Sequence, residues 1–253
     1  MKIASWNVNS IRVRLEQVLE WLDGEQPDVL GLQELKMPTT DFPVEAFKEL
    51  GYHSLVNGQK TYNGVALLSR QTGESPHLDI PNFEDPQKRA VAATFNDCRV
   101  VNLYVPNGQS VGSDKYEYKL NWLAALGAWL RDEITQHEKL VVMGDFNIAP
   151  DDRDVHDPDE WLDKILCSEA ERGALNGLLE LGLQDSFRLF EQPEAAFSWW
   201  DYRAAGFRRN RGLRIDLLLV SGAVASECKK SHIDKEPRTL ERPSDHAPVW
   251  IEF

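Results

Sequence analysis

The sequence predicts an α/β fold, a layered sandwich in which mixed β-sheets are flanked by helices. Short apolar segments typical of strands alternate along the chain with longer segments whose apolar residues recur at helical spacing. Asn96 and Asp97 lie between two apolar segments and favour a hairpin turn, so part of a sheet should be antiparallel. A chain of 253 residues with 42% hydrophobic content can bury one large core, and we expect a single domain over residues 1–253.

The elements of the N-terminal half follow from local apolar patterns. Residues 12–22 carry apolar side chains on one helical face, which predicts a helix that Gly24 should end. A short helix is expected over residues 42–51. The strands expected in this half are residues 2–8, 28–33, 62–69, 90–95 and 99–105.

The C-terminal half contains the longest helical pattern, residues 116–136, whose leucine stripe should pack on a sheet. A second amphipathic helix is expected over residues 169–181. Residues 151–159 are acidic, and we expect a solvated loop there. The strands expected in this half are residues 141–147, 215–220 and 249–253.

Composition argues against several classes of protein. Cys98, Cys167 and Cys228 are widely spaced without a CxxC pair, which argues against a disulfide framework and a structural zinc site. The N-terminus begins directly with strand-like sequence, and no apolar run is long enough to span a bilayer. We therefore expect a soluble, cytoplasmic protein that does not bind membranes.

The formal net charge of −13 argues against a surface that binds nucleic acid over a wide area, because such surfaces are usually basic. Positive charge is nevertheless concentrated in residues 199–214, where arginines alternate with aromatic side chains. The local field matters more than the net charge for attracting a ligand. An acidic protein with one basic, aromatic strip is compatible with contact to a nucleic acid through a single face.

Polar residues with catalytic chemistry recur at the predicted strand ends. Taken singly, such residues are usually turn formers, solvated acids or satisfied buried histidines. Strand ends on one edge of a sheet converge, however, so these side chains should meet in one site. The residues are Asn7, Glu34, Tyr104, Asp145, Asn147, Asp216, Asp245 and His246.

These residue types suit the hydrolysis of a phosphodiester, which needs an activated water and positive charge on the phosphoryl oxygens. Glu34 and Asn7 offer oxygen ligands suited to Mg²⁺ or Mn²⁺. Asp145 could deprotonate the water, and Asn147 could hold the water or a phosphoryl oxygen.

His246 directly follows Asp245, so the two side chains should diverge. The carboxylate expected to orient the imidazole is therefore Asp216, which comes from another strand. The ring would then be able to bind a phosphate oxygen.

A series of short motifs runs in order through essentially the whole chain: Trp-Asn-Val-Asn-Ser-Ile-Arg (6–12), Leu-Gln-Glu-Leu-Lys (32–36), Tyr-Asn-Gly-Val-Ala (62–66), Gly-Asp-Phe-Asn-Ile-Ala-Pro (144–150), Trp-Asp-Tyr-Arg (200–203), Arg-Gly-Leu-Arg-Ile-Asp (211–216) and Pro-Ser-Asp-His-Ala-Pro (243–248). Through these motifs the sequence resembles the exonuclease III family of abasic-site DNA repair nucleases, in the wider endonuclease/exonuclease/phosphatase superfamily. Several independent motifs in the right order make the resemblance specific.

The resemblance implies a four-layer α/β sandwich, in which two mixed sheets pack face to face with helices on both outer faces. It implies a metal-dependent DNA repair phosphodiesterase that cleaves double-stranded DNA 5′ to abasic sites. At 3′ ends the enzyme would act as a 3′–5′ exonuclease and as a 3′-phosphatase or 3′-repair diesterase in base excision repair. The implied cofactor is Mg²⁺, with Mn²⁺ as a substitute, and we expect a monomer of the compact bacterial type.

The resemblance also implies roles for the site residues. The catalytic residues would be Tyr104, Asp145, Asn147, Asp216 and His246. Whether one or two metal ions operate stays open. The metal ligands would come from Asn7, Glu34, Asp145, Asn147, Asp245 and His246.

For the DNA, the resemblance implies a small apolar pocket lined by Trp199, Leu213 and Ile215. An extrahelical abasic deoxyribose would enter this pocket, and a normal base would not fit. The loops at residues 109–113 and 163–168 are candidates for setting the balance between the activities of the family. The other implied DNA contacts are Arg12, Lys36, Asn107, Lys119 and Arg211.

Two other functions stay open on the sequence. The first is a superfamily hydrolase that acts on a lipid or inositol phosphate, or a secreted nonspecific nuclease. Neither is expected to carry the segment from Trp200 to Asp216, and a secreted form should have a signal peptide. The second is an inactive relative that binds RNA, which should have lost metal ligands, yet every carboxylate of the site is present.

Overall fold

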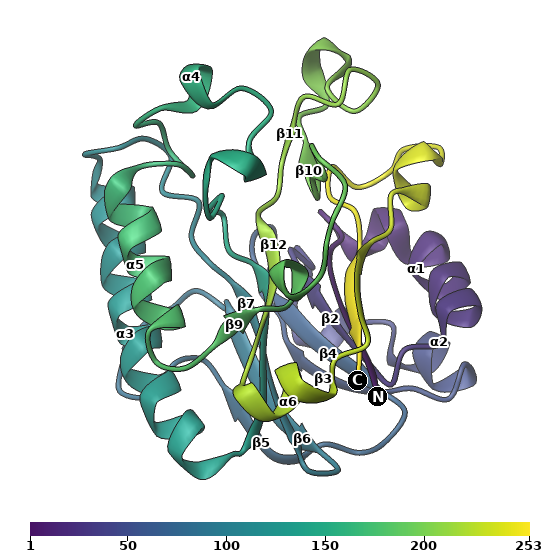
Figure 1. Cartoon of the computed structure of the whole chain (residues 1–253). Coiled ribbons are helices and arrows are strands. Elements are labelled where there is room, and N and C mark those ends of the chain that lie inside the picture. Colours follow the sequence, from purple (N-terminus) through teal and green to yellow (C-terminus); the bar gives the residue numbers. More distant parts are fainter.

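The computed structural model describes residues 1–253 and contains two six-stranded sheets (Figure 1). In the first sheet the central pair, β1 and β2, is parallel, and every other pair is antiparallel. A helix joins the two parallel strands, as a parallel connection requires. In order across this sheet, the strands are β13 (Lys230–Ile233), β14 (Val249–Glu252), β1 (Lys2–Asn7), β2 (Val29–Gln33), β4 (Val65–Ser69) and β3 (His53–Asn57).

The second sheet repeats this pattern. Its one parallel pair, β7 and β8, is again joined by a helix and is again flanked by antiparallel strands. The hairpin expected at Asn96-Asp97 joins β6 to β7. In order across this sheet, the strands are β5 (Glu74–Leu78), β6 (Ala90–Phe95), β7 (Cys98–Tyr104), β8 (Lys139–Asp145), β12 (Asp216–Val220) and β9 (Gln184–Asp185).

Helices cover the two outer faces, so the molecule has four layers, and the expected fold class is confirmed. Val18 and Phe47 are buried in the apolar cluster under the first sheet, and Leu126 and Leu175 are buried in the cluster under the second. Figure 1 shows one pair of helices at the right of the sheets and another at the left. These helices are α1 (Ile11–Glu25), α2 (Val44–Glu49), α3 (Asp114–Gln136) and α5 (Glu169–Leu179).

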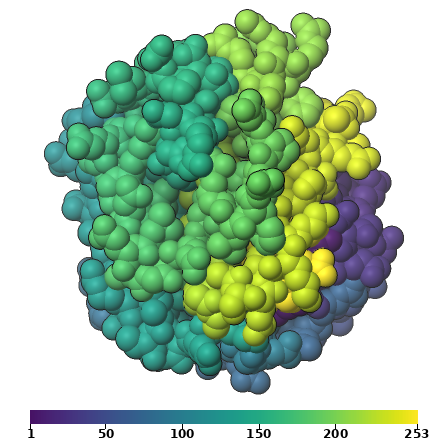
Figure 2. All heavy atoms as spheres, viewed as in Figure 1, coloured from purple at the N-terminus to yellow at the C-terminus, as the bar shows by residue number.

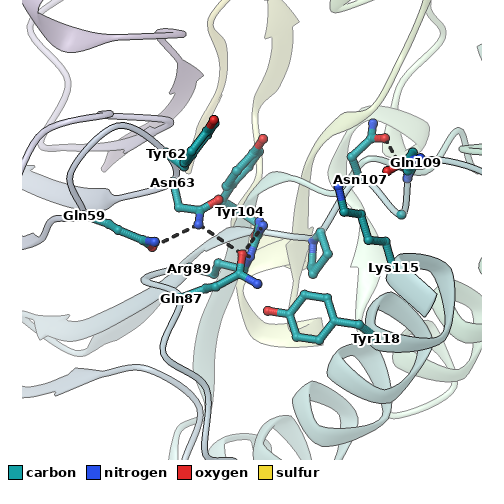
Figure 3. A pocket seen from close by; sticks show the side chains of 12 residues that line it. Gln59, Tyr62, Asn63, Gln87, Arg89, Tyr104, Asn107, Gln109, Lys115 and Tyr118 are labelled. Atoms are coloured by element: carbon teal, nitrogen blue, oxygen red, sulfur yellow. Dashed lines mark hydrogen bonds between the residues drawn. The ribbon is translucent and has the colours of Figure 1, made fainter. Parts of the chain in front are cut away.

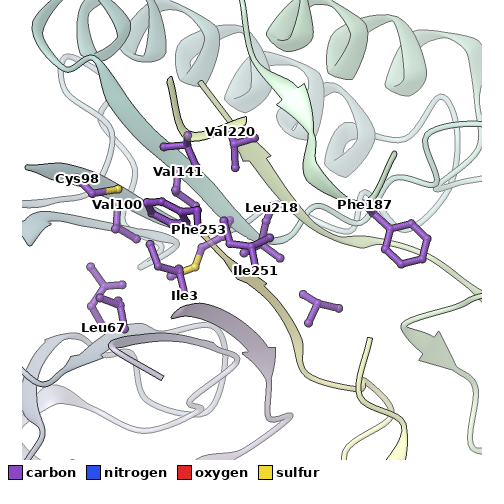
Figure 4. Close-up of a cluster of buried hydrophobic side chains, with 14 of the residues drawn as sticks. Ile3, Leu67, Cys98, Val100, Val141, Phe187, Leu218, Val220, Ile251 and Phe253 are labelled. Carbon is purple, nitrogen blue, oxygen red and sulfur yellow. The ribbon is translucent and has the colours of Figure 1, made fainter. Parts of the chain in front are cut away.

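The main core lies between the two sheets. It is a cluster of 22 buried apolar residues, to which both sheets contribute. Figure 4 shows Ile3 and Ile251 of the first sheet close to Val141 and Leu218 of the second. Burying one such side chain contributes about 1.5–3 kcal/mol, so this layer holds the sheets together.

A group of buried amide contacts crosses this apolar layer. Gln33 Nε2, at the end of β2, donates to Asn102 Oδ1 in β7 at 2.6 Å. Asn102 Nδ2 donates in turn to the carbonyl oxygens of Leu32 and Ala66 at 3.0 and 2.9 Å. Gln33 and Asn102 are fully buried. A buried amide without partners is costly, so this contact favours one placement of the sheets on each other.

Smaller elements stand at the upper end of the sheets in Figure 1, where β8 ends and β12 begins. They include α4 (Pro158–Trp161) and the hairpin of β10 (Trp199–Trp200) and β11 (Gly212–Leu213). In Figure 2 the light-green tip of this hairpin projects from the surface. The remaining helices are α6 (Gly222–Glu227), η1 (Thr39–Asp41), η2 (Asp152–Asp154), η3 (Ser186–Leu189), η4 (Arg203–Ala205) and η5 (Glu236–Thr239).

The two chain ends lie side by side at the opposite end of the sheets, where Phe253 N–H donates to the Met1 carbonyl oxygen at 3.0 Å. None of the helices combines the length and the apolar character needed to cross a bilayer.

Three expectations about the elements need correction. Gly24 lies inside α1, and the helix runs on to Glu25 and is capped by Gln26, which adopts the left-handed conformation at φ 47°. The strand expected over residues 141–147 ends at Asp145. The sequence did not predict the four edge strands, which are β3, β5, β9 and β13. These strands are short or have mostly exposed side chains, so they lack a continuous apolar pattern.

Candidate active site

The carboxyl ends of the two parallel pairs meet at one edge of the sandwich. β1 ends at Asn7 and Glu34 follows β2, while β7 ends at Tyr104 and β8 ends at Asp145. Tyr104 and Asp216 lie opposite Asp145 on its two neighbouring strands. The convergence expected from the sequence therefore joins residues from both sheets.

Gly144 allows β8 to reach this edge. Its φ is 145°, and a Cβ atom at this position would lie 1.9 Å from the Leu103 carbonyl oxygen of β7. No side chain can occupy that space without moving the backbone, so only glycine fits directly before Asp145.

Asn7 joins the carboxylates of the two sheets. Its Nδ2 donates to Glu34 Oε1 at 2.9 Å and to Asp145 Oδ2 at 2.8 Å. Its Oδ1 accepts a hydrogen bond from the Asn9 N–H at 2.9 Å. Asn7 thus orients the two carboxylates through its nitrogen, and its own role as a metal ligand stays a prediction.

Glu34, Asp145 and His246 could hold a metal ion. Their ligand atoms all lie within 4.8 Å of one another. Glu34 has a φ of 51°, a conformation that is uncommon outside glycine, and its Oε2 lies 3.0 Å from Lys36 Nζ. Carboxylate oxygens are the ligands that hard divalent cations prefer, so Glu34 and Asp145 fit Mg²⁺ or Mn²⁺ better than the imidazole does.

His246 is oriented by Asp216, as the sequence predicted. Its Nδ1 lies 2.9 Å from Asp216 Oδ2, and its Nε2 lies 3.7 Å from Asp145 Oδ2. Ser198 Oγ donates to Asp216 Oδ2 at 2.7 Å and accepts from the Asp216 N–H at 3.0 Å. All four residues are buried, so the ring has one well-defined orientation.

Burial and neighbouring charges shift the pKa values of this group. Burial alone would lower the pKa of His246, but Asp216 and Asp145 outweigh it and raise this pKa to about 10. Burial raises the pKa of Asp145, although the positive charge of His246 opposes the rise. Burial and the charges of Glu34 and Asp145 raise the pKa of Tyr104 well above its ordinary value. At neutral pH the imidazole is therefore a cation, and the Tyr104 hydroxyl keeps its proton.

Asn147 lies beside Asp145, but not because the two share a strand. Asn147 adopts φ 49°, and its N–H donates to Asp145 Oδ1 at 2.9 Å, which makes a tight turn. Its Nδ2 donates to the Val105 carbonyl oxygen at 3.0 Å, and its Oδ1 accepts from Asn107 Nδ2 at 3.0 Å. One amide hydrogen of Asn147 is left for a ligand.

Asp245 points away from His246, as expected for neighbours in sequence. Its Oδ1 accepts from Asn9 Nδ2 at 2.9 Å, and its Oδ2 accepts from Trp199 Nε1 at 3.0 Å. It is not part of the group that could hold a metal ion, so its role as a ligand stays a prediction. In the structure it fixes the indole of Trp199.

The three residues expected to line an apolar pocket do lie together. Trp199 pairs with Leu213 in the β10–β11 hairpin, and both belong to a small apolar cluster that includes Ile215. Leu213 and Ile215 are buried, however, and only Trp199 keeps exposed surface. Val155 and Leu166, from the loops around α4, close the cluster.

Two basic residues expected to contact DNA are engaged within the protein. Lys119 has no exposed surface, and its Nζ donates to the Asn147 carbonyl oxygen at 2.7 Å and pairs with Glu171. A phosphate contact by Lys119 is therefore wrong for this structure. Arg211 pairs with Glu160 of α4 at 2.6 Å and so connects the hairpin to that helix.

The other expected DNA contacts remain available at the surface. Arg12 and Asn107 are exposed, and Lys36 is half-buried beside Glu34.

Arg214, in the basic strip of residues 199–214, is buried and pairs with Asp154 at 2.6 Å. Asp154 is itself fully buried, and is thus an exception among the acids of residues 151–159, most of which were expected to be solvated.

Sequence reasoning missed Ser198 and Arg89. Ser198 directly precedes Trp199, so its place beside a recognised motif was the available signal. Arg89, buried close to Tyr104, gave no local signal, because a single arginine before an apolar strand is ordinary.

The chain is similar to known proteins that are described as nucleases or as a DNA 3′ phosphatase. Residues 4–246 match the Endonuclease/Exonuclease/phosphatase family. The chain is 41% identical to "Exodeoxyribonuclease III" of Haemophilus influenzae over 266 aligned residues, which cover 100% of both chains. The structure is similar to the 3′ phosphatase NExo from Neisseria bound to a product DNA hairpin, with 50% identity, a TM-score of 0.98 and coverage of 100% and 99% of the two chains. It is also similar to an AP endonuclease from Archaeoglobus fulgidus, with 37% identity, a TM-score of 0.96 and coverage of 100% and 99%. The chain therefore belongs to the Endonuclease/Exonuclease/phosphatase family, and within it resembles exodeoxyribonuclease III.

Proposed function

We propose that this protein is a divalent-metal-dependent DNA repair phosphodiesterase that cuts duplex DNA 5′ to abasic sites and also acts at 3′ ends. The observation that carries the proposal is the buried group of Asp145, His246 and Asp216 beside the carboxylate of Glu34. The relatives described as an exodeoxyribonuclease, a 3′ phosphatase and an AP endonuclease support the same substrate class.

The reaction is the attack of water on a phosphodiester. The water oxygen forms a bond to phosphorus, and the bond between phosphorus and the 3′ oxygen breaks, which leaves a 3′-hydroxyl and a 5′-phosphate. Asp145 takes the proton of the water, because its carboxylate is fixed by Asn7 and by the Asn147 N–H and faces the same space as Glu34. The departing 3′ oxygen takes a proton from solvent.

Hydrogen-bond donors around this space stabilise the negative charge that develops on the phosphoryl oxygens. We assign His246 to this role, because Asp216 binds its Nδ1 and thereby directs its Nε2 toward the space beside Asp145. Its Nε2–H then donates to a phosphate oxygen. The free amide hydrogen of Asn147 and the hydroxyl of Tyr104 are further donors at the same edge.

A divalent cation held by Glu34 and Asp145 would supply positive charge for the phosphate and the leaving oxygen. We propose Mg²⁺ as the physiological ion, with Mn²⁺ as a substitute, because both bind carboxylate oxygens.

Selection of abasic DNA follows in this proposal from the cluster of Trp199, Leu213 and Ile215. A deoxyribose without its base costs less to turn out of the helix than a normal nucleotide, and a small apolar site excludes a base. Trp199, held by Asp245, is the exposed part of that site.

The test compares three duplexes with Mg²⁺ and with a chelator: one with an internal abasic site, one with a 3′-phosphate and one with an unmodified recessed 3′ end. Wild-type protein should cut 5′ to the abasic site only with metal, and Asp145→Asn should lower the rate by at least about 10³-fold, since it removes the proton acceptor. Asp97→Asn, at an exposed hairpin turn, is the control and should keep full activity. If none of the three duplexes is cut, the proposal is wrong.

A further inference from the structure

The residues at the junction of β11 and β12 serve two parts of the site. Leu213 and Ile215 belong to the apolar cluster proposed to select abasic DNA, and Asp216 orients His246. Arg214 lies among them, is only 1% exposed and has no part in the reaction proposed above. Arginine is rarely buried in a protein unless its charge is paired.

The Arg214 guanidinium joins two carboxylates from different parts of the chain. Its Nε donates to Asp154 Oδ1 at 2.6 Å, and its Nη2 donates to Asp185 Oδ2 at 2.6 Å. A longer bond of 3.2 Å completes each pair, from Nη2 to Asp154 Oδ2 and from Nη1 to Asp185 Oδ1. Asp154 also pairs with Arg188. Such two-pronged pairs fix a carboxylate in both distance and direction.

Only the Asp154 side of this contact reaches the apolar cluster. Asp154 ends η2, and the next residue, Val155, belongs to the cluster and forms a β-bridge with Leu213. The backbone repeats the connection, because the Arg214 N–H donates to the Asp154 carbonyl oxygen at 2.9 Å. Asp185, in contrast, ends β9 and caps η3, which contribute nothing to the cluster. A movement of Asp154 therefore moves a wall of the cluster, and a movement of Asp185 does not.

Selection by size cannot come from the large cavity at the site. This cavity has a volume of about 660 Å³ and is lined by Tyr104, Asn107 and other mainly polar side chains (Figure 3). None of its lining residues belongs to the apolar cluster. A space of this size admits a nucleotide with its base. The selecting element is therefore the apolar cluster, whose walls have to be held to within about 0.5 Å.

We propose that Arg214 is a positioning residue for substrate selection. It holds residues 151–155, the η2 loop, against Leu213 and so keeps the apolar cluster too small for a base. The inference rests on the proposed function, because it concerns how abasic DNA is distinguished from intact DNA. Arg214 acts through Asp154 and Val155 and does not itself touch the DNA. A directional ion pair suits this task, because apolar contacts alone would let the loop shift.

The experiment compares Asp154→Asn with Asp185→Asn. Each change removes one carboxylate charge from the same guanidinium at a contact of the same length, 2.6 Å, so each should lower stability in urea unfolding. The preference is measured as the ratio of the dissociation constants for an intact duplex and for the same duplex with one abasic site, with a chelator present so that nothing is cut. Asp154→Asn should lower this preference by about tenfold or more, the effect of a pocket that is wrong by one methylene group. Asp185→Asn should keep the wild-type preference.

Two changes of the arginine complete the series. Arg214→Lys keeps the charge but cannot form a two-pronged pair with each carboxylate, so it should lose part of the preference. Arg214→Met also removes the charge and should lose as much preference as Asp154→Asn. If Arg214→Met does not fold, Arg214→Lys and the two Asn variants still give the comparison.

Two results would overturn the inference. One is a wild-type preference in both Asp154→Asn and Arg214→Lys. The other is an equal fall in preference in Asp154→Asn and Asp185→Asn, which would show that the ion pairs act only through overall stability. Wild-type protein tests the proposed function separately with Mg²⁺. If it cuts no abasic duplex, that proposal fails, while the preferences measured with a chelator still decide the role of Arg214.

Discussion

Replacing Lys119 by methionine decides whether this lysine is part of the framework or a contact to DNA. Its Nζ donates to the carbonyl oxygens of Asn147 and Asn107 at 2.7 and 3.2 Å and pairs with Glu171. Methionine has a similar volume but no charge. Lys119→Met would therefore leave the carboxylate of Glu171 buried without its cation.

We expect this change to lower the free energy of unfolding by about 3 kcal/mol, the lower end of the range for breaking a buried ion pair. The lower end applies because Glu171 still accepts from the N–H groups of Leu166 and Ser168, each at 3.1 Å. For a chain of this length, a loss of about 3 kcal/mol corresponds to a fall in Tm of about 6–12 °C. Adding Glu171→Gln should restore much of the loss, because the unpaired charge is removed.

Urea unfolding and thermal melting measure the loss, with Lys48→Met as control because that side chain is 70% exposed. The control should change stability by less than about 0.5 kcal/mol. The reasoning is refuted if Lys119→Met is as stable as wild type and its DNA affinity depends less on salt. That result would support the original expectation that Lys119 contacts a DNA phosphate.

Three further predictions concern single side chains. Ser198→Ala should lower kcat about tenfold with little change in KM, because Asp216 loses a hydrogen-bond donor, and Ser198→Thr should restore kcat in steady-state kinetics. Gly144→Ala should cost about 3 kcal/mol or more in urea unfolding, because its Cβ would lie 1.9 Å from a carbonyl oxygen. Gly173→Ala, at an exposed position of α5 with open space around it, should be neutral or stabilising, and a larger loss of stability in Gly173→Ala than in Gly144→Ala would contradict the argument. Trp199→Ala should reduce the preference for abasic over intact duplex more than it reduces affinity for intact duplex, and equal losses in a binding titration would speak against its place in the pocket.

The sequence predicted those parts of the fold whose signals are local. Strand β12 is buried along its whole length and β8 at every residue except Lys139, and most of their residues form continuous apolar runs in the sequence. The edge strands β3 and β5 could not be found in this way, because β3 is mostly half-buried, β5 is mostly exposed, and pairing, not composition, makes them strands. The resemblance then supplied the layer order, which local patterns do not contain.

For the site, the sequence predicted which residues converge but not how each is engaged. The contact between Asp216 and His246 follows from the residue types and strand ends, and the structure contains it. The burial of Lys119 could not be foreseen, because its partner Glu171 is 52 residues away in the chain. The same holds for Arg89, whose lack of a counter-ion becomes visible only when the surrounding loops are in place.

The buried amide contact between Gln33 and Asn102 has a consequence for how this protein tolerates change. Asn7 comes from one sheet and Asp145 from the other, so a sliding of the layers by even a fraction of an ångström would alter the 2.8 Å contact between them. An entirely apolar interface permits several alignments of similar energy, whereas a directional contact selects one. Substitutions in the core that shift one sheet against the other should therefore lower catalytic activity before they unfold the protein. A change in one sheet should then require a compensating change in the other.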